Sequence, residues 1–258
     1  TTTDQIKIEH LGQTGLKIDL ESLTVLVDPY LSHSVQELEA PDLVRQVPIP
    51  YQPRDLTDID WVLMTHEHMD HCDPHTIPIL AEVSPQCRFV GPRAVREQLR
   101  QWGIQENKIF SSPDADIDLG NGLSVRSIAA AHPTIRRDHH GCPQAVGYLF
   151  TYQERILYAA GDTSVCDEMI ELLQQLPKID VALLPVNEDN YFRRRRGIVG
   201  NMSVREAFEL AQEVKIKEVI PVHWDMFECN STSQEEILGA YSSKNWAFSL
   251  GNVKSIKL

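Results

Sequence analysis

A histidine-rich segment directly behind a short apolar run constrains this chain more than any other feature. Residues 61–64 are apolar, and the segment that follows places three imidazoles and a carboxylate at His66, His68, Asp70 and His71. Histidine is the commonest protein metal ligand, and a buried ionisable side chain is costly unless it is paired or bound to a cation. The alternative is a chance group of surface histidines, which such specific spacing disfavours. The order H-x-H-x-D-H therefore predicts half of a metal site in the loop after a buried strand.

Further acidic or histidine residues follow other predicted strands. They are Asp28 after 25–27, His132 after 125–131, Asp162 after 156–161 and His223 after 219–222. Strand ends gather at one rim of a sheet, where a rigid frame supports functional loops. A lone histidine is weak evidence by itself, and Asp28 is equally consistent with a strand that ends in a turn. Their shared position at strand ends is what predicts a common site.

The order of predicted elements indicates sheets covered by helices. Period-two alternation and short apolar runs predict strands at 6–11, 16–20, 24–29, 61–64, 88–90, 107–110, 116–130, 145–151, 155–160, 179–186, 218–222 and 252–257. Helical spacing and start signals predict helices from about residue 76, from Pro92 to Trp102, and over 167–176, 203–214 and 233–241. Residues 32–58 have no clear hydrophobic period and are predicted to form a long connecting segment. We expect residues 1–258 to form a single domain.

Composition excludes several classes of protein. The chain has 258 residues and a net charge of −13, which disfavours a binder of nucleic-acid phosphates. No apolar run approaches the ~18 residues of a membrane span, and the polar residues 1–5 do not resemble a secretory signal. The five cysteines are scattered and never spaced C-x-x-C, which favours reduced thiols. We therefore expect a cytoplasmic protein that binds neither nucleic acid nor a membrane.

In order along the chain, H-x-H-x-D-H, a lone histidine, Gly-Asp after a strand and Pro-x-His after another strand resemble the pattern of the metallo-β-lactamase superfamily. The resemblance covers nearly the whole chain. It implies an α/β (α+β) fold, the four-layer αββα sandwich. It also implies two divalent metal ions, one held by His66, His68 and His132, the other by Asp70, His71 and His223, with Asp162 bridging them.

The residue types agree with that implication. Imidazoles and carboxylates without cysteine suit Zn²⁺, Mn²⁺ or Fe. Two cations ~3.5–4 Å apart can share one water, lower its pKa toward neutrality and so generate a hydroxide that attacks a carbonyl or phosphorus centre. The cations would then stabilise the oxygen charge that develops. We expect Asp70 to be a catalytic residue as well as a ligand, and Asp28 to accept a hydrogen bond from a ligand imidazole.

Within the superfamily, five segments are most similar to the L-ascorbate-6-phosphate lactonase group. They cover residues 89–95, 161–164, 179–185, 200–203 and 220–227. That resemblance implies a cytoplasmic hydrolase of the lactonase or esterase type, with manganese or zinc and with iron also acceptable. It implies a small anionic, sugar-phosphate-like substrate. Because the family often forms symmetric oligomers, it also implies a homo-oligomer.

The segment 187–196 follows a predicted strand and ends in four arginines. We predict that Asn187, Arg193 and Arg194 contact the substrate, because arginine binds phosphate or carboxylate through two parallel hydrogen bonds. A solvated loop or a subunit contact is the alternative reading of this segment. Residues 136–140 are also rich in arginine and histidine, but an exposed polar loop is favoured there over a substrate flap.

Other functions on the same ligands remain open. A phosphodiesterase or nuclease would use the same site, although the acidic balance argues against a nucleic-acid substrate. A di-iron protein that reduces oxygen would also use it, but such proteins normally work with a flavin domain. A catalytically silent scaffold is disfavoured by the full set of ligand residues.

Overall fold

The computed structural model describes residues 6–242 and 247–248, which form two mixed β-sheets. The first sheet has the order β1-β2-β3-β4-β5-β6. Its strands are β1 (Lys7–Gly12), β2 (Gly15–Leu20), β3 (Leu23–Val27), β4 (Trp61–Leu63), β5 (Arg88–Gly91) and β6 (Ile109–Ser111). The second sheet has the order β13-β12-β11-β10-β9-β8-β7. Its strands are β7 (Ile117–Gly120), β8 (Leu123–Ala129), β9 (Val146–Tyr152), β10 (Arg155–Ala159), β11 (Val181–Pro185), β12 (Glu218–Val222) and β13 (Ala247–Phe248).

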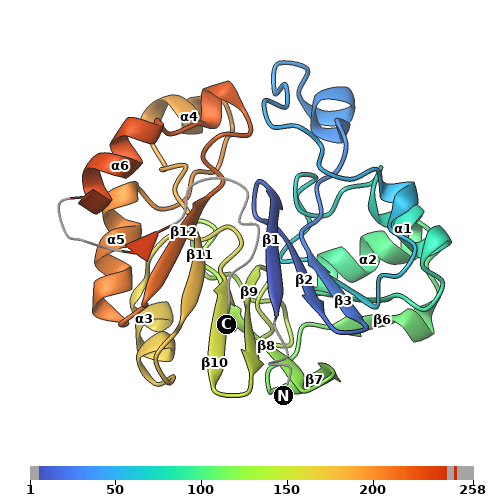
Figure 1. Ribbon diagram of the computed structural model, residues 1–258. Coiled ribbons are helices and arrows are strands. Elements are labelled where there is room, and N and C mark those ends of the chain that lie inside the picture. The colour runs from blue at the N-terminus through green and yellow to red at the C-terminus, as the bar shows by residue number, and fades with distance from the viewer. Residues whose placement is uncertain (1–5, 243–246, 249–258) are drawn as a thin grey trace.

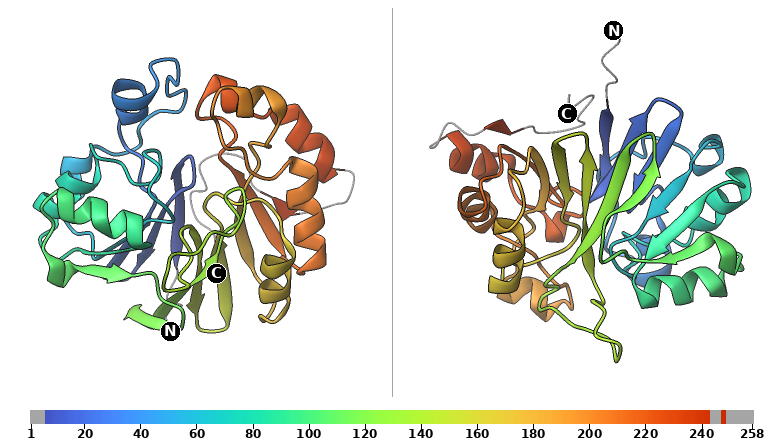
Figure 2. Two further views of the ribbon diagram at one scale, coloured as in Figure 1. Left: turned by 180° about the vertical axis from the view of Figure 1, so that it is seen from behind. Right: turned by 90° about the horizontal axis from the view of Figure 1, so that it is seen from below.

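Helices cover the outer face of each sheet, as Figure 1 shows. The first sheet carries α1 (Ile77–Val83) and α2 (Arg93–Gln101). The second carries α3 (Asp167–Gln174), α5 (Val204–Glu213) and α6 (Gln234–Ser242), while the short α4 (Tyr191–Arg195) lies above it. Single turns of other helix types occur at Val35–Glu39, Pro53–Asp55, Glu106–Lys108 and Glu228–Asn230. The layers separate clearly when the molecule is viewed from below (Figure 2).

Strand periodicity explains the layers. In β3, Val25 and Val27 pack between the sheets, whereas Leu26 packs against the helices of the first sheet. In β11, Leu183 and Leu184 divide in the same way between the inter-sheet core and the helices of the second sheet. Successive side chains of a strand point to opposite faces, so a strand that is buried on both faces is apolar throughout. The expected four-layer αββα sandwich is confirmed.

Strand direction brings the ends of distant strands to one rim. Strands β3 to β6 are parallel, as are β10 to β13. Strand β8 runs in the same direction as β10, because each is antiparallel to β9. The loops that follow β3, β4, β8, β10 and β12 therefore leave their sheets at carboxyl ends, and these are the loops that carry the predicted site residues.

Two local expectations differ from the structure. The strand predicted over 116–130 is a hairpin of β7 and β8, because Asn121 and Gly122 both adopt positive φ and form a tight turn between them. The 187–196 segment, expected to be a loop, contains α4, whose Asn190 side chain caps the helix through the Arg193 amide. The strand predicted over 252–257 lies outside the described residues.

Within the described part of the chain, no helix is both long enough and apolar enough to cross a membrane. The assignment of residues 1–258 to a single domain stays a prediction.

Candidate metal centre

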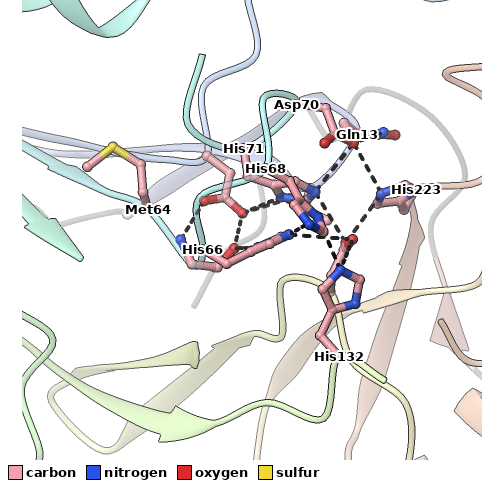
Figure 3. Close-up of polar contacts among 12 residues, drawn as sticks. Gln13, Met64, His66, His68, Asp70, His71, His132 and His223 are labelled. Carbon is pink, nitrogen blue, oxygen red and sulfur yellow. Dashed lines mark hydrogen bonds and ion pairs between the residues drawn. The ribbon is translucent and has the colours of Figure 1, made fainter. Parts of the chain in front are cut away.

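The structure brings all seven predicted ligand side chains together at the rim between the two sheets. The five labelled imidazoles point toward one another from the loops that follow β4, β8 and β12 (Figure 3). The donor atoms form two groups, and within each group all atoms lie within 4.8 Å of one another. The first group is His66, His68, His132 and Asp162, and the second is Asp70, His71 and His223.

The first group has the spacing of a tetrahedral site. His68 Nδ1 lies 3.0 Å from His66 Nε2 and 3.2 Å from His132 Nε2. Asp162 Oδ2 lies 3.8 Å from His66 Nε2 and 3.6 Å from His132 Nε2. Ligands held ~2.0–2.2 Å from a tetrahedral cation are roughly 3.3–3.6 Å apart, so these four atoms can surround one ion with small adjustments.

The second group uses the other oxygen of Asp162. Asp162 Oδ1 lies 3.4 Å from His71 Nε2 and 3.3 Å from His223 Nε2. Asp70 Oδ2 lies 3.4 Å and 3.5 Å from the same two nitrogen atoms. Because each oxygen of Asp162 faces a different group, this carboxylate has the geometry of a bridge between two cations.

Buried atoms without hydrogen-bond partners support a cation at this place. Among the described residues, His71 Nε2, His223 Nε2 and Asp162 Oδ1 are buried and make no hydrogen bond. Buried polar atoms are nearly always satisfied, and binding of an ion is one of the standard explanations for an exception. The oxygen and nitrogen donors also fit Zn²⁺, Mn²⁺ or Fe in type.

The pKa values of the clustered histidines also support a cation in the centre. Burial alone would lower the pKa of His223, but Asp162 and Asp70 outweigh that effect and raise this pKa to about 9. The pKa of His71 also lies well above its usual range, because Asp162, Asp70 and Asp28 outweigh burial. The pKa of His66 lies well below its usual range, owing first to burial and then to the neighbouring His71. Without a cation the cluster would thus hold protons that a metal must displace.

Asp28 orients two of the ligand rings. Its Oδ2 lies 2.8 Å from His71 Nδ1 and accepts the Thr65 hydroxyl hydrogen at 2.7 Å. Thr65 Oγ1 in turn lies 3.0 Å from His66 Nδ1. With a proton on Nδ1, both rings present a free Nε2 to the centre, which is the usual way in which a metal-binding histidine is fixed. Asp28 is fully buried at the end of β3, as the predicted role requires.

Gln13 belongs to the centre and was not identified from the sequence. It lies in the turn between β1 and β2, where its Nε2 donates to Asp70 Oδ2 at 2.7 Å. Its backbone oxygen accepts the His223 amide hydrogen at 3.1 Å. The segment Gly12–Gly15 identifies only a turn in the sequence, and nothing in it shows that this turn reaches a rim formed by β12.

Three non-glycine residues around the centre have positive φ. They are Gln13 at 55°, Asp28 at 43° and His223 at 61°. This backbone conformation costs side-chain-bearing residues ~1–2 kcal/mol, and such strain tends to gather at functional sites.

A small cavity gives access to the first donor group. It has a volume of about 130 Å³ and is lined by His66, His68 and His132 and by residues of the 133–145 loop. His68 is exposed, whereas His66 is buried. Arg136 is the one arginine in the lining of this cavity. A substrate would therefore approach from the side of His68 and Arg136.

The predicted substrate contacts Asn187, Arg193 and Arg194 lie elsewhere. Asn187 is buried and exchanges hydrogen bonds with Asn201 and Asn230. The guanidinium of Arg193 donates to the backbone oxygens of Glu188 and Ser231, and Arg194 forms an ion pair with Asp189. These contacts connect α4 to its neighbours, and none of the three residues lines the cavity beside His66 and His68.

Known proteins resemble this chain over most of its length. It is 28% identical over 223 residues to a protein of Pyrobaculum islandicum named a metal-dependent hydrolase, covering 86% of this chain and 85% of the relative. It is 23% identical to an N-acyl-phosphatidylethanolamine-hydrolyzing phospholipase D of Caenorhabditis elegans, covering 86% of this chain and 64% of that protein.

A solved structure shows the same fold. The isothiocyanate hydrolase from Delia radicum gut bacteria superposes with a TM-score of 0.74 at 18% identity, covering 98% of each chain. At this identity the likeness concerns architecture alone.

A family model also matches most of the chain. The model of the beta-lactamase superfamily domain matches residues 24–224, a span that runs from β3 past His223 and contains all seven side chains of the two donor groups. With well over half of the chain matched and the αββα layers in place, this protein belongs to the metallo-β-lactamase superfamily.

Proposed function

We propose that the protein is a metal-dependent hydrolase that holds two divalent cations and cleaves an ester or lactone of a small anionic substrate. The observation that carries the proposal is the pair of donor groups that share Asp162. His66, His68 and His132 would hold one cation. Asp70, His71 and His223 would hold the other. Bound divalent cations supply Lewis acidity and lower the pKa of water, which is the chemistry that ester hydrolysis needs.

The side chains of the centre take separate roles in this proposal. Asp70 is the carboxylate that solvent reaches, since its side chain is 17% exposed against 5% for Asp162. It is therefore the group best placed to orient the attacking water and to hold the proton that the water loses. Asp162 remains a buried bridge. Asp28 and Thr65 keep His71 and His66 in the tautomers that present Nε2.

The anionic part of the substrate is proposed to bind Arg136. This residue lines the cavity beside His68 and His132, and it forms no ion pair within the described residues. The earlier assignment of substrate binding to Asn187, Arg193 and Arg194 remains a competing proposal, which requires α4 to release its present contacts.

The proposal also covers the substrate size, location and assembly of the enzyme. A net charge of −13 supports a small substrate rather than nucleic acid, and the sequence pattern supports a cytoplasmic enzyme without membrane attachment. A symmetric homo-oligomer and the lactonase type of reaction are supported by the sequence resemblance alone.

The first test combines metal analysis with turnover. After treatment with a chelator, the protein is reloaded with Mn²⁺, Zn²⁺ or Fe²⁺, its metal content is measured, and lactones, carboxylic esters and phosphodiesters are assayed. We expect two ions per chain and turnover of a lactone or ester. His66→Ala should lose one ion and all turnover, whereas exposed His33→Ala should lose neither. Turnover of phosphodiesters alone would instead favour the phosphodiesterase, which the phospholipase D relative also makes a reasonable candidate.

The second test separates the two sets of arginines. Arg136→Gln should raise KM roughly ten- to a hundredfold with a smaller effect on kcat, because it removes a charged hydrogen bond to the substrate. Arg194→Gln is the matched control and should leave KM unchanged. A raised KM in Arg194→Gln with an unchanged KM in Arg136→Gln would instead assign substrate binding to the 187–196 segment.

A further inference from the structure

A second cavity lies apart from the one at the metal centre. It has a volume of about 750 Å³ and lies between the amino-terminal end of α2, strand β8 and helix α3. The left panel of Figure 2 shows α2 and α3 on either side of the segment that follows β8. Small-molecule sites commonly occupy ~300–1,000 Å³, so this cleft is large enough for a whole metabolite.

One turn separates the cleft from the metal centre. Residues Arg137 and Pro143 pair across this turn, and the Gln144 amide donates to the Arg136 oxygen at 2.8 Å. Arg136 and Gln144 line the small cavity at the metal centre, whereas Arg137 and Pro143 line the large cleft. Consecutive residues of a paired, extended segment point to opposite sides, so the turn forms a shared wall.

The lining of the cleft is basic although the protein is acidic. Four arginines line it, against two acidic residues, in a chain with a net charge of −13. The arginines are Arg93, Arg96, Arg126 and Arg137, and the acidic residues are Asp114 and Glu168. An excess of positive charge in a concave lining favours ligands of negative charge.

Arg96 is the arginine that is free to bind a ligand. Arg93, Arg126 and Arg137 already form ion pairs, with Glu97, Asp116 and Glu168. Arg96 lines the cleft and forms no ion pair within the described part of the chain. A guanidinium whose charge no carboxylate neutralises pairs well with an anion, and an anion in the cleft would be such a partner.

The start of α2 adds backbone donors to the same wall. Helix α2 has nine residues and begins after Pro92 without a side-chain cap. Gly91, Pro92 and Arg93 line the cleft, and helix geometry leaves the Arg93 amide, in the first turn, without an acceptor inside the helix. Arg93 and Arg96 are three residues apart and therefore lie on the same face of α2. Amides, helix dipole and guanidinium groups together form a recognised type of phosphate site.

We propose that this cleft binds the phosphate group of a small phosphorylated molecule, separately from the metal centre. A phosphate there would accept hydrogen bonds from Arg96 and from the first turn of α2. The rest of the molecule would extend toward Arg126, Arg137 and the β8 wall. Because Arg137 follows Arg136 directly, the bound molecule would also contact the turn that forms one side of the metal-centre cavity.

Titration calorimetry with inorganic pyrophosphate at constant ionic strength tests the proposal on the metal-loaded protein. We expect Arg96→Gln to weaken binding at least tenfold. This substitution breaks no ion pair of the fold, so the variant should remain folded. Arg205→Gln, an exposed position on α5, is the matched control and should bind like the unsubstituted protein.

A second pair of measurements distinguishes the cleft from the metal centre, which can itself attract pyrophosphate. Binding at the cleft should persist in His66→Ala and in chelator-treated protein. Binding that disappears in both and is unchanged in Arg96→Gln would assign the anion to the metal centre and overturn the proposal, as would an absence of binding. A protein that hydrolyses no ester but still binds pyrophosphate through Arg96 would leave the cleft standing while the proposed function fails.

Discussion

Gln13 illustrates how a single residue can fix two residues of the second donor group. Its amide donates to Asp70 Oδ2, and its backbone oxygen holds the amide of His223. Its own Oε1 is buried without a hydrogen-bond partner among the described residues. The residue is thus placed to set the orientation of a carboxylate ligand without itself being a ligand.

We predict that Gln13→Ala weakens the affinity for the second cation roughly 10–100-fold, because Asp70 loses the donor that orients it. Competition with a chromogenic chelator measures this affinity. Gln174→Ala, which removes an exposed amide that pairs with Glu213, is the control and should bind both ions normally. Equal affinities in the two variants would show that Gln13 has no positioning role.

The raised pKa of His223 predicts the pH dependence of the metal-free protein. Its folded-state pKa of about 9 lies above the unfolded value of about 6.5. The charged ring therefore contributes stability that is fully present below pH ~6.5 and is lost as the pH rises through about 9. In chelator, the melting temperature should fall over this interval, and the fall should be smaller in His223→Gln. Metal-loaded protein should show no such fall, since its ligand histidines are already neutral.

At the scale of elements, the turn after β10 depends on one glycine. Gly161 has a φ of +63°, and a Cβ added there would lie 2.7 Å from the Thr65 side chain. Thr65 is the residue through which Asp28 reaches His66. The Gly-Asp pair therefore allows the loop that carries Asp162 to approach the loop that carries His66.

We expect Gly161→Ala to lower the free energy of unfolding by ~2–4 kcal/mol, through positive φ and the clash with Thr65 together. Gly197→Ala is a matched control, because Gly197 has a φ of +76° but open space at its Cβ position. It should cost only ~1 kcal/mol, the effect of backbone conformation alone. Denaturant unfolding of both variants measures the difference, and equal losses would mean that the contact with Thr65 is unimportant.

At the scale of the whole molecule, the centre joins the two sheets. The ligands of the H-x-H-x-D-H motif follow β4 in the first sheet, whereas His132, Asp162 and His223 follow β8, β10 and β12 in the second. Bound cations would therefore hold together two layers that otherwise contact each other through apolar side chains.

Metal removal should consequently lower the melting temperature by roughly 10 °C, given ~4 kcal/mol for a ligand at a thousand times its dissociation constant and ~2–4 °C per kcal/mol for a chain of this size. Differential scanning calorimetry with and without chelator measures the change. Hydrogen exchange should increase in the loops of both sheets at this rim. An increase in hydrogen exchange confined to the loops of one sheet would contradict an arrangement in which the cations link both sheets.

Much of this architecture is readable from local pattern. Ser203 and Glu206 form a capping box at the start of α5, and their Ser-x-x-Glu spacing is a sequence signal for a helix start. The covering of sheets by helices also follows, because period-two strands and period-3.6 helices bury their apolar faces in only a few ways. The four-layer αββα order was implied by the family resemblance. The hairpin at Asn121 and Gly122 was not predicted, although the sequence contains a local signal for it, since that pair is a typical two-residue turn. The helix at 191–195 had little local signal beyond the capping Asn190, because its stability comes from contacts to distant loops.

The sequence by itself determined the residue types of the metal centre, since three imidazoles and a carboxylate behind a buried strand can hardly serve any other purpose. Only the tertiary structure decided that Asp162 faces both donor groups, that Gln13 holds Asp70, and that Arg136 rather than Arg193 lines the cavity. The physical reason is that these relations join loops from different strands and different sheets. Spacing along the chain defines what one loop carries, whereas the distance between loops is set by how the layers pack.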